Sequence, residues 1–242
     1  MQRVQVSCSG METLVLESGI TPDAVFRIPI GINLDLFAPP MEAQRHAVRA
    51  ELGLPESATV IGSFQKDGVG WEDGLEPKLI KGPDVLLQTI ERLNSEVKNL
   101  TVLLSGPARG YVKQGLSRLG IPFKHIFFKD YISLCRIYQA LDLYLVTSRE
   151  EGGPKSVLES MASGVPLVST RVGQAVDLIQ HGVNGWLADV EDVEGLTYWA
   201  LRALSTASDL PAIRTAARRT AEANSYMVQL PLWREFFRGF VE

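Results

Sequence analysis

The amino-acid sequence predicts an α/β protein built on a Rossmann-like parallel sheet flanked by helices. From about residue 58 onward, short apolar runs alternate with stretches of helical periodicity. The apolar runs are continuous, as in strands that are covered on both faces, instead of alternating with polar residues. Strands that alternate with helices are joined by crossover connections, which make the strands parallel and place helices on both faces of the sheet.

Five strands and four helices are expected in this region. In the first helix, Val85, Leu86 and Ile90 fall on one face, and Pro83 suits the first helical position. The expected strands are Thr59–Phe64, Thr101–Ser105, His125–Phe128, Leu143–Thr147 and Val165–Ser169. The expected helices are Pro83–Ser95, Tyr111–Leu119, Leu134–Ala140 and Pro154–Ser163.

The two ends of the chain differ from this middle. Residues 1–39 contain one short strand, one helix candidate and a connecting segment, which is too little for a core of their own. We interpret them as the remnant of a preceding domain and a linker, and residues 40–209 as the Rossmann-like domain. Residues 210–242 form a basic and then aromatic helical segment. Its aromatic residues recur at near-helical spacing, which predicts packing against a neighbouring surface: Trp233, Phe236, Phe237 and Phe240.

Composition excludes several classes of protein. The chain has 242 residues, 45% of them hydrophobic and 21% charged, as is typical of a globular protein. A formal net charge of −4 argues against a nucleic-acid partner, since phosphate neutralisation needs a basic surface. Cys8 and Cys135 fit no metal spacing and are interpreted as structural thiols in a reducing compartment. No apolar run is long enough to span a bilayer, so we expect a cytoplasmic protein, with peripheral contact at the inner face of the membrane left open.

The segment SREEGGPKSVLESMASGVPLVST, residues 148–170, carries the candidate site. Ligands of open α/β sheets bind at the carboxyl ends of strands, and Glu151 follows such a strand end. Gly152 and Gly153 form a turn before a helix that Pro154 begins. The N–H groups of the first helical turn, at Lys155 and Ser156, then form an anion site together with the helix dipole.

A second carboxylate lies on the same helix. Glu159 projects away from the apolar stripe of that helix, so its carboxylate is expected to face the cleft instead of the core. Two carboxylates on either side of a phosphate site suit a ligand with hydroxyl groups at both ends, such as a nucleotide-sugar. The alternative interpretation is that Glu151 and Glu159 are solvated surface acids, and a pair of glutamates alone would favour it.

The wider segment resembles the donor-binding signature of the family-4 (group 1) glycosyltransferases of GT-B fold. That signature has two glutamates separated by seven residues, a helix end of small residues, a Gly-x-Pro strand entry, a glycine-bearing loop and an Asn-Gly turn. The matching positions here are Glu151, Glu159, Met161–Pro166, Gly173 and Asn184–Gly185, and the resemblance covers about residues 26–205.

The resemblance implies that residues 40–209 bind a nucleotide-sugar and that the chain carries the donor half of a retaining, hexosyltransferase-type enzyme, as in polysaccharide biosynthesis. Glu151 would contact hydroxyls of the transferred sugar, and Glu159 would bind the ribose. One departure concerns the usual Gly-Phe-Gly, which is Gly152-Gly153-Pro154 here. Pro154 donates no N–H, and the charge of Lys155 would compensate.

A second basic site lies in the long loop between residues 64 and 83. The family has an arginine after the glycine and a Lys-Gly before the next helix, both of which bind the diphosphate. Lys81 matches the second, whereas Ser63 stands where the arginine would be, so Lys66 is the candidate replacement. A cationic group stabilises the leaving diphosphate as the glycosidic bond breaks, which places Lys81 with Glu151 among the catalytic candidates. Lys78 is interpreted as a solubilising residue.

The remaining polar candidates have structural alternatives. Arg109 follows another strand and is a donor-binding candidate, with a solvated loop as the alternative. Asp130 and Tyr131 precede a helix near the place where the family holds the base. His46, His125 and His181 match no metal or triad spacing and are expected to be structural. The sequence has no Asp-x-Asp motif, which fits the metal-independent chemistry that the resemblance implies, and no cofactor is expected.

The segment RIPIGINLDLFAPP resembles the crossing between the halves of these enzymes, with Asn33 where the family commonly has Asp. We therefore expect an acceptor half outside this sequence, an acceptor that is a glycan, a lipid or a small molecule, and little transfer by the isolated chain. Two alternatives remain: a non-catalytic nucleotide-sugar-binding module that needs a partner for the acceptor, or a sugar-nucleotide epimerase of the same fold.

Overall fold

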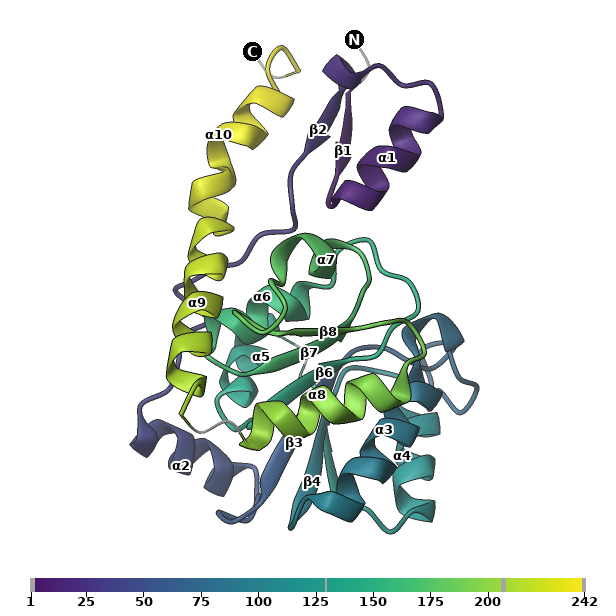
Figure 1. The fold of residues 1–242 in the computed structure, drawn as a ribbon, viewed down its shortest axis with the longest axis vertical. Helices are drawn as coiled ribbons and strands as arrows, with labels where there is room; N and C mark the ends of the chain where they lie inside the picture. Colours follow the sequence, from purple (N-terminus) through teal and green to yellow (C-terminus); the bar gives the residue numbers. More distant parts are fainter. Residues whose placement is uncertain (1–2, 129, 206–207, 241–242) are drawn as a thin grey trace.

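A six-stranded parallel sheet forms the centre of the computed structural model, which describes residues 3–128, 130–205 and 208–240 (Figure 1). The strand order is β5-β4-β3-β6-β7-β8. Chain order runs outward from β3 in one direction and from β6 in the other, which is the Rossmann arrangement. The strands are β3 (Thr59–Phe64), β4 (Leu100–Ser105), β5 (Phe123–Ile126), β6 (Leu143–Val146), β7 (Leu167–Thr170) and β8 (Trp186–Ala188). The predicted fold class is confirmed.

Helices cover both faces of this sheet, so its strands are buried on both sides (Figure 1). One apolar core lies beneath α3 (Pro83–Glu96), α4 (Gly110–Arg118) and α8 (Val193–Ser205). The other lies beneath five helices: α2 (Glu42–Glu51), α5 (Tyr131–Tyr138), α6 (Lys155–Ala162), α7 (Gln174–Leu178) and α9 (Leu210–Ala223).

Several element boundaries differ from the sequence expectation. The strand β8 and the helix α8 were not expected, because a three-residue strand is too short to stand out as an apolar run. The helix α2 is mostly polar and buries only Val48 and Arg49, so its periodicity is weak. The helix α5 begins earlier than predicted because the Asp130 carboxylate accepts a hydrogen bond from the Ser133 N–H at 2.7 Å and caps it. Pro154 is the N-cap residue of α6 and not its first helical residue.

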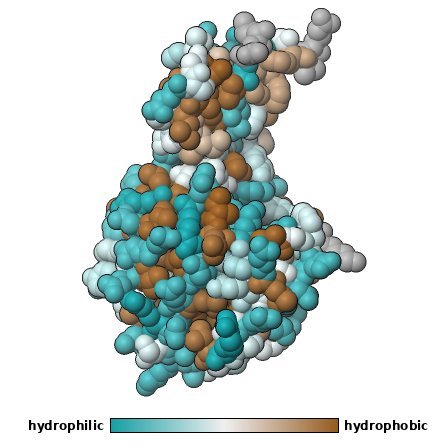
Figure 2. All heavy atoms as spheres, turned by 90° about the vertical axis from the view of Figure 1, so that its right-hand side faces the viewer, coloured by the Kyte–Doolittle hydropathy of each residue, from teal (hydrophilic) through white to brown (hydrophobic). Residues whose placement is uncertain are grey.

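A second, smaller unit lies beyond the carboxyl ends of β6 and β7 (Figure 1). It consists of β1 (Val4–Val6), α1 (Ser9–Glu17), a 3₁₀ turn (Pro22–Ala24) and β2 (Val25–Arg27), with β1 and β2 parallel. Met11, Leu14 and Leu16 of α1 are exposed. Viewed from the side of α1, Figure 2 shows apolar side chains gathered on this upper unit.

The chain returns to the small unit through its last helix. The segment expected to be one helical stretch is two helices, α9 and α10 (Tyr226–Phe236), with a break at Asn224–Ser225. The Phe236 ring packs edge-on against Phe26 of β2 with centroids 5.4 Å apart. At the break, the Ile32 N–H donates to the Asn224 carbonyl at 3.2 Å, and the Tyr226 N–H donates to the Ile32 carbonyl at 3.0 Å. The two crossings between the units therefore lie side by side.

Candidate functional site

The candidate site lies at the carboxyl ends of β3 and β6, where the strand order reverses. Two segments meet there: the turn before α3 (Leu79–Lys81) and the loop after β6. The Thr147 hydroxyl donates to the Gly82 carbonyl at 3.0 Å. Gly82 has φ of 60°, and a Cβ at this position would lie 1.9 Å from the Thr147 carbonyl oxygen. Only glycine permits this approach, which fixes Lys81 beside the β6 loop.

Lys81 and Glu151 form an ion pair at this point. The Lys81 Nζ lies 2.5 Å from Glu151 Oε1, and the Ser148 hydroxyl donates to the same oxygen at 2.9 Å. The two side chains are 24% and 15% exposed, so solvent still reaches them. The structure thus brings together the two residues that the sequence predicts as catalytic, although 70 positions separate them.

The Gly152–Gly153 turn lies against the small unit. The Ser7 hydroxyl donates to the Gly152 carbonyl at 2.9 Å, and a Cβ on Gly152 would lie 3.2 Å from the Met11 sulfur. A Cβ on Gly153 would lie 2.6 Å from Ile30 Cδ1. A side chain on Gly153 would therefore require the linker residue Ile30 to move, and Gly152 lies next to the small unit, contacts that the sequence analysis did not consider.

The helix α6 begins next to this turn. Lys155 is exposed, and its Nζ lies 4.4 Å from the centroid of the Tyr131 ring, which is a cation–π geometry. Ser156 is half-buried in the same first turn. The predicted anion site at this helix start therefore has a cation beside it, held by a ring of α5.

Glu159 lies elsewhere than expected. It is 4% exposed and lies between α5 and α6, so the expectation that it faces an open cleft is wrong. The Tyr138 hydroxyl donates to Glu159 Oε2 at 2.8 Å, and the Tyr131 hydroxyl donates to Oε1. Burial raises the pKa of Glu159, against the opposing effects of the two tyrosine hydroxyls and Lys155.

The two tyrosines are functional candidates that the sequence analysis missed or passed over. They are seven residues apart, about two helical turns, and so share one face of α5. Tyr138 is fully buried, whereas Tyr131 is 39% exposed. That spacing was the available signal, but the partner carboxylate comes from another helix and cannot be found by periodicity.

Lys66 does not contact the Lys81–Glu151 pair. Its Nζ lies 3.8 Å from the centroid of the Trp71 ring. It lines a hollow of about 380 Å³ at the carboxyl ends of β3, β4 and β5, together with Gly106, Phe127 and Tyr131. This hollow has aromatic walls, one cation in Lys66 and one carboxylate in Asp130.

Arg109 is not available to a ligand, which corrects the prediction of a donor contact or a solvated loop. Its side chain is fully buried, and its Nε lies 2.9 Å from Asp67 Oδ1, which is equally buried. The guanidinium also donates to the carbonyls of Ser63 and Ser105 at 2.6 and 2.9 Å. Arg109 therefore fastens the long loop after β3 to the sheet. The position after the glycine of β3, where the arginine of the family is absent, holds Ser63, whose hydroxyl oxygen accepts from this guanidinium at 3.2 Å.

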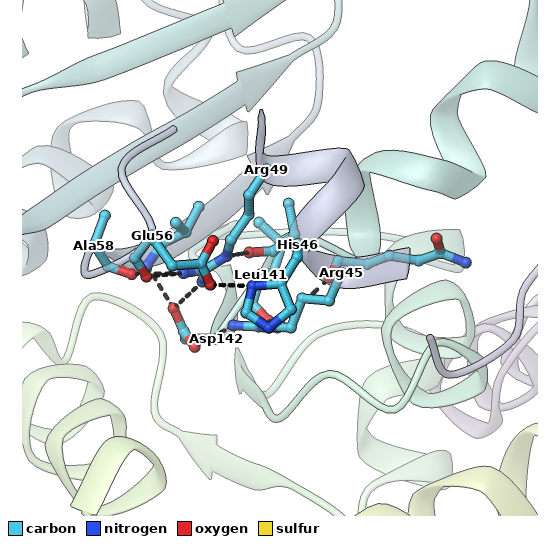
Figure 3. Close-up of polar contacts among 10 residues, drawn as sticks. Arg45, His46, Arg49, Glu56, Ala58, Leu141 and Asp142 are labelled. Atoms are coloured by element: carbon cyan, nitrogen blue, oxygen red, sulfur yellow. Dashed lines mark hydrogen bonds and ion pairs between the residues drawn. The ribbon is translucent and has the colours of Figure 1, made fainter. Parts of the chain in front are cut away.

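The histidines have structural partners, as expected. His46 Nδ1 lies 2.6 Å from a Glu56 carboxylate oxygen, and Figure 3 shows both beside the Asp142 ion-pair network. His125 Nε2 lies 2.8 Å from the Gly106 carbonyl oxygen. His181 Nδ1 accepts from the Leu187 N–H at 3.1 Å.

In the described part of the chain, no helix is both long and apolar enough to cross a membrane.

Comparison with curated proteins identifies relatives in several bacteria. The chain is 32% identical over 193 residues to the D-inositol 3-phosphate glycosyltransferase of Xylanimonas cellulosilytica, which covers 75% of this chain and 43% of that protein. It is 28% identical over 161 residues to the N-acetyl-alpha-D-glucosaminyl L-malate synthase of Bacillus anthracis, covering 65% and 39%. The chain thus spans less than half the length of these relatives.

Solved structures show the same fold at low identity. A glycosyltransferase from Rickettsia africae superposes with a TM-score of 0.80 at 20% identity, covering 98% of this chain and 64% of that one. HepE of Anabaena in complex with UDP-glucose superposes with a TM-score of 0.81 at 21% identity, covering 99% and 63%. Both are GT-B-type matches to the architecture described above.

The profile of the family "Glycosyl transferases group 1" matches residues 74–206, more than half of the chain. That range contains Lys81, the Glu151–Glu159 segment and all helices that flank the site. The chain therefore belongs to the group 1 glycosyltransferases and has the fold of a C-terminal GT-B domain.

Proposed function

We propose that this chain binds the nucleotide-sugar donor of a retaining glycosyl transfer, in which a hexose passes to an acceptor. The Lys81–Glu151 ion pair at the switch point of the sheet is the observation that carries the proposal. The Lys81 ammonium can bind anionic oxygens of a ligand and the Glu151 carboxylate can accept from its hydroxyls, and the two groups lie within hydrogen-bond distance of each other. HepE of Anabaena, which superposes on nearly the whole chain, is in complex with UDP-glucose, and this supports the ligand class.

Lys81 is proposed to bind the diphosphate. An ammonium group has three donors, and the ion pair uses one of them. The remaining donors are free to bind diphosphate oxygens and to stabilise the charge that develops on the leaving group. Together with Lys155 and the start of α6, Lys81 supplies positive charge without a metal ion. Binding is therefore expected to persist in EDTA.

Glu151 is proposed to bind hydroxyls of the transferred sugar. The ammonium of Lys81 and the hydroxyl of Ser148 both contact Oε1. The other oxygen, Oε2, has no hydrogen-bond partner within the described residues and can accept from a sugar hydroxyl. The Gly152–Gly153 backbone next to it would face the same ligand.

Glu159 is proposed to bind the ribose. In the absence of ligand, the Tyr131 hydroxyl would occupy the position of a ribose hydroxyl. Both carboxylate oxygens accept from tyrosine hydroxyls, and only Tyr131 reaches solvent. A ribose hydroxyl that displaced the Tyr131 hydroxyl would give Glu159 an equivalent partner. The hollow that contains Lys66 adjoins Tyr131 and would hold the base.

The test is thermal unfolding of the chain with a panel of UDP-, GDP-, ADP- and dTDP-sugars, followed by calorimetric titration of the best ligand. A ligand that binds only the folded state raises the midpoint, and the rise grows with the logarithm of the ligand concentration once this exceeds Kd. Lys81→Ala should abolish the shift, and Lys78→Ala, which removes an exposed lysine three positions away, should leave it intact. Glu159→Ala should weaken binding without unfolding the chain. No stabilisation by any nucleotide-sugar, or equal stabilisation of the Lys81 and Lys78 variants, would refute the proposal.

We further propose that the complete enzyme retains the anomeric configuration of the transferred sugar. The anomeric configuration of the product, measured by NMR with the complete enzyme, tests it directly. A product of inverted configuration would refute retention while leaving donor binding intact.

A further inference from the structure

A hollow at the C-terminal end of α6 is lined by arginines. It measures about 640 Å³, within the range of pockets that bind small molecules. It lies between α2, the ends of α5 and α6, and α9, at the left of Figure 1. Its guanidinium groups come from Arg45, Arg214, Arg218 and Arg219, and we call it the arginine pocket.

Two of these arginines are fixed by the fold. Arg218 donates to the carbonyls of Phe37 and Ala162 at 2.9 and 2.8 Å, and its Nε bonds the Glu222 carboxylate at 2.9 Å. Arg45 donates to the Leu141 carbonyl and to the Asp142 carboxylate at 2.7 and 2.5 Å, as Figure 3 shows. These bonds satisfy the Ala162 carbonyl at the end of α6 and two carbonyls outside the helices, and they fix the wall of the pocket.

The other two arginines have no anionic partner. Within the described residues, no carboxylate lies within ion-pair distance of Arg214 or Arg219, although both line the pocket. The Asp142 carboxylate is shared with Arg49, so it neutralises Arg45 only in part. Burial, opposed by Asp142, lowers the pKa of Arg45, and the neighbouring charges of Arg49 and Arg214 add to this effect. The pocket thus holds an excess of positive charge.

Ser163 is a buried polar residue in the wall of the pocket. It lines the pocket and is 1% exposed, yet its hydroxyl oxygen has no hydrogen-bond partner among the described residues. A buried hydroxyl without a partner costs free energy, so such groups in native proteins call for a partner.

We propose that the arginine pocket binds the phosphate group of a ligand, at a second site separate from the donor site. Arginine pairs favour phosphate because their planar donors match its oxygens. The pocket lies at the Ala162 end of α6, about 12 Å along the helix from Lys155. Tyr138, which lines the pocket, also donates to Glu159, so the pocket adjoins the ribose side of the donor site. The ligand is either a soluble phosphate ester or a phospholipid headgroup, since both present the same group.

Calorimetric titration of the chain with sodium phosphate and with glycerol 3-phosphate, at low ionic strength, tests the soluble source. The Arg214→Ala/Arg219→Ala variant should bind at least about tenfold more weakly, since each charge-assisted bond contributes roughly that factor. The Lys98→Ala/Arg118→Ala variant is the matched control, because it removes two exposed cations on the opposite face of the sheet.

Co-sedimentation with phosphatidylglycerol and phosphatidylcholine vesicles tests the lipid source. Binding to the first alone, lost in the double-arginine variant, would identify a headgroup as the ligand. Thr215→Glu adds a carboxylate to the same wall of the pocket. It should weaken binding as the double-arginine variant does, in the phosphate titration or in the vesicle experiment, whichever detects binding by the wild type. Equal binding by wild type and the double-arginine variant in both arms, or no binding in either, would overturn the proposal.

Discussion

Glu159 is a carboxylate whose folded environment differs sharply from water. Its raised folded pKa means that the folded state holds this proton more tightly than the unfolded chain does. Protonation of Glu159 therefore stabilises the fold below its unfolded pKa, and this contribution is lost as the pH rises through the folded value. Glu159→Gln is neutral at every pH and should remove this titration.

The measurement is urea unfolding of wild type and Glu159→Gln at a series of pH values. Relative to wild type, the variant should gain in free energy of unfolding as the pH rises from about 4, near the ordinary value for glutamate. Parallel pH curves for the two proteins would contradict the predicted shift.

The two tyrosines that bind Glu159 should differ in their effect on stability. Tyr138→Phe leaves a buried carboxylate oxygen without its donor and should cost about 1–3 kcal/mol. Tyr131→Phe should cost less, because Tyr131 is 39% exposed and water can replace its hydroxyl. Urea unfolding at neutral pH checks both. A larger loss in Tyr131→Phe would show that the solvent-exposed contact is the more important one.

The position of a site residue was predictable where a local motif contains it. It was not predictable where the residue contacts a segment that is distant in the sequence. Glu151 follows from a strand end and the glycine turn after it, whereas Lys81 follows from the resemblance to the family. The burial of Glu159 depends on α5 packing over α6, and no local pattern shows which face of α6 another helix will cover. Arg109 has the same explanation, because its partner Asp67 lies on a loop 42 positions away.

At the scale of elements, the long loop after β3 depends on the buried Arg109–Asp67 pair. Neither side chain reaches solvent, and the Lys78 N–H donates to the Asp67 carbonyl at 2.8 Å within the same loop. Arg109→Ala would leave the Asp67 carboxylate buried without its cation. We expect a loss of about 3–5 kcal/mol.

Chemical unfolding checks this value, with Arg118→Ala as the control on the same helix α4, where a change within about 0.5 kcal/mol is expected. Arg109→Met combined with Asp67→Asn removes both charges and should recover part of the loss. A double variant no more stable than Arg109→Ala would contradict the role of the unpaired charge.

The order of the strands is a further property of elements that the sequence did not contain. Alternation of strands and helices made a parallel sheet predictable. Whether β6 pairs with β3 or with β5 depends on which faces the helices cover, since both arrangements obey the same local pattern. β3 pairs with both β4 and β6, and this creates the switch point at which Lys81 and Glu151 meet.

At the scale of the whole molecule, the small unit is held on the larger one by polar contacts of α1. The Ser9 N–H and hydroxyl both donate to the Asp177 carboxylate of α7, at 2.7 and 2.5 Å. Asp177→Ala should therefore raise amide hydrogen exchange in α1 and leave the exchange of β3–β7 unchanged. Asp189→Ala removes an exposed acid that pairs with Arg171 within the larger unit, and it is the control. Unchanged exchange in α1 would show that other contacts suffice.

The side-by-side crossings at Ile32 and Ser225 have a mechanical consequence. A single linker lets two bodies swivel in any direction, whereas two linkers that are hydrogen-bonded to each other form a hinge with one preferred axis. The turning arc of the small unit would then sweep α1 toward and away from the Gly152–Gly153 turn. The paired crossings therefore set the direction in which α1 can move relative to this turn.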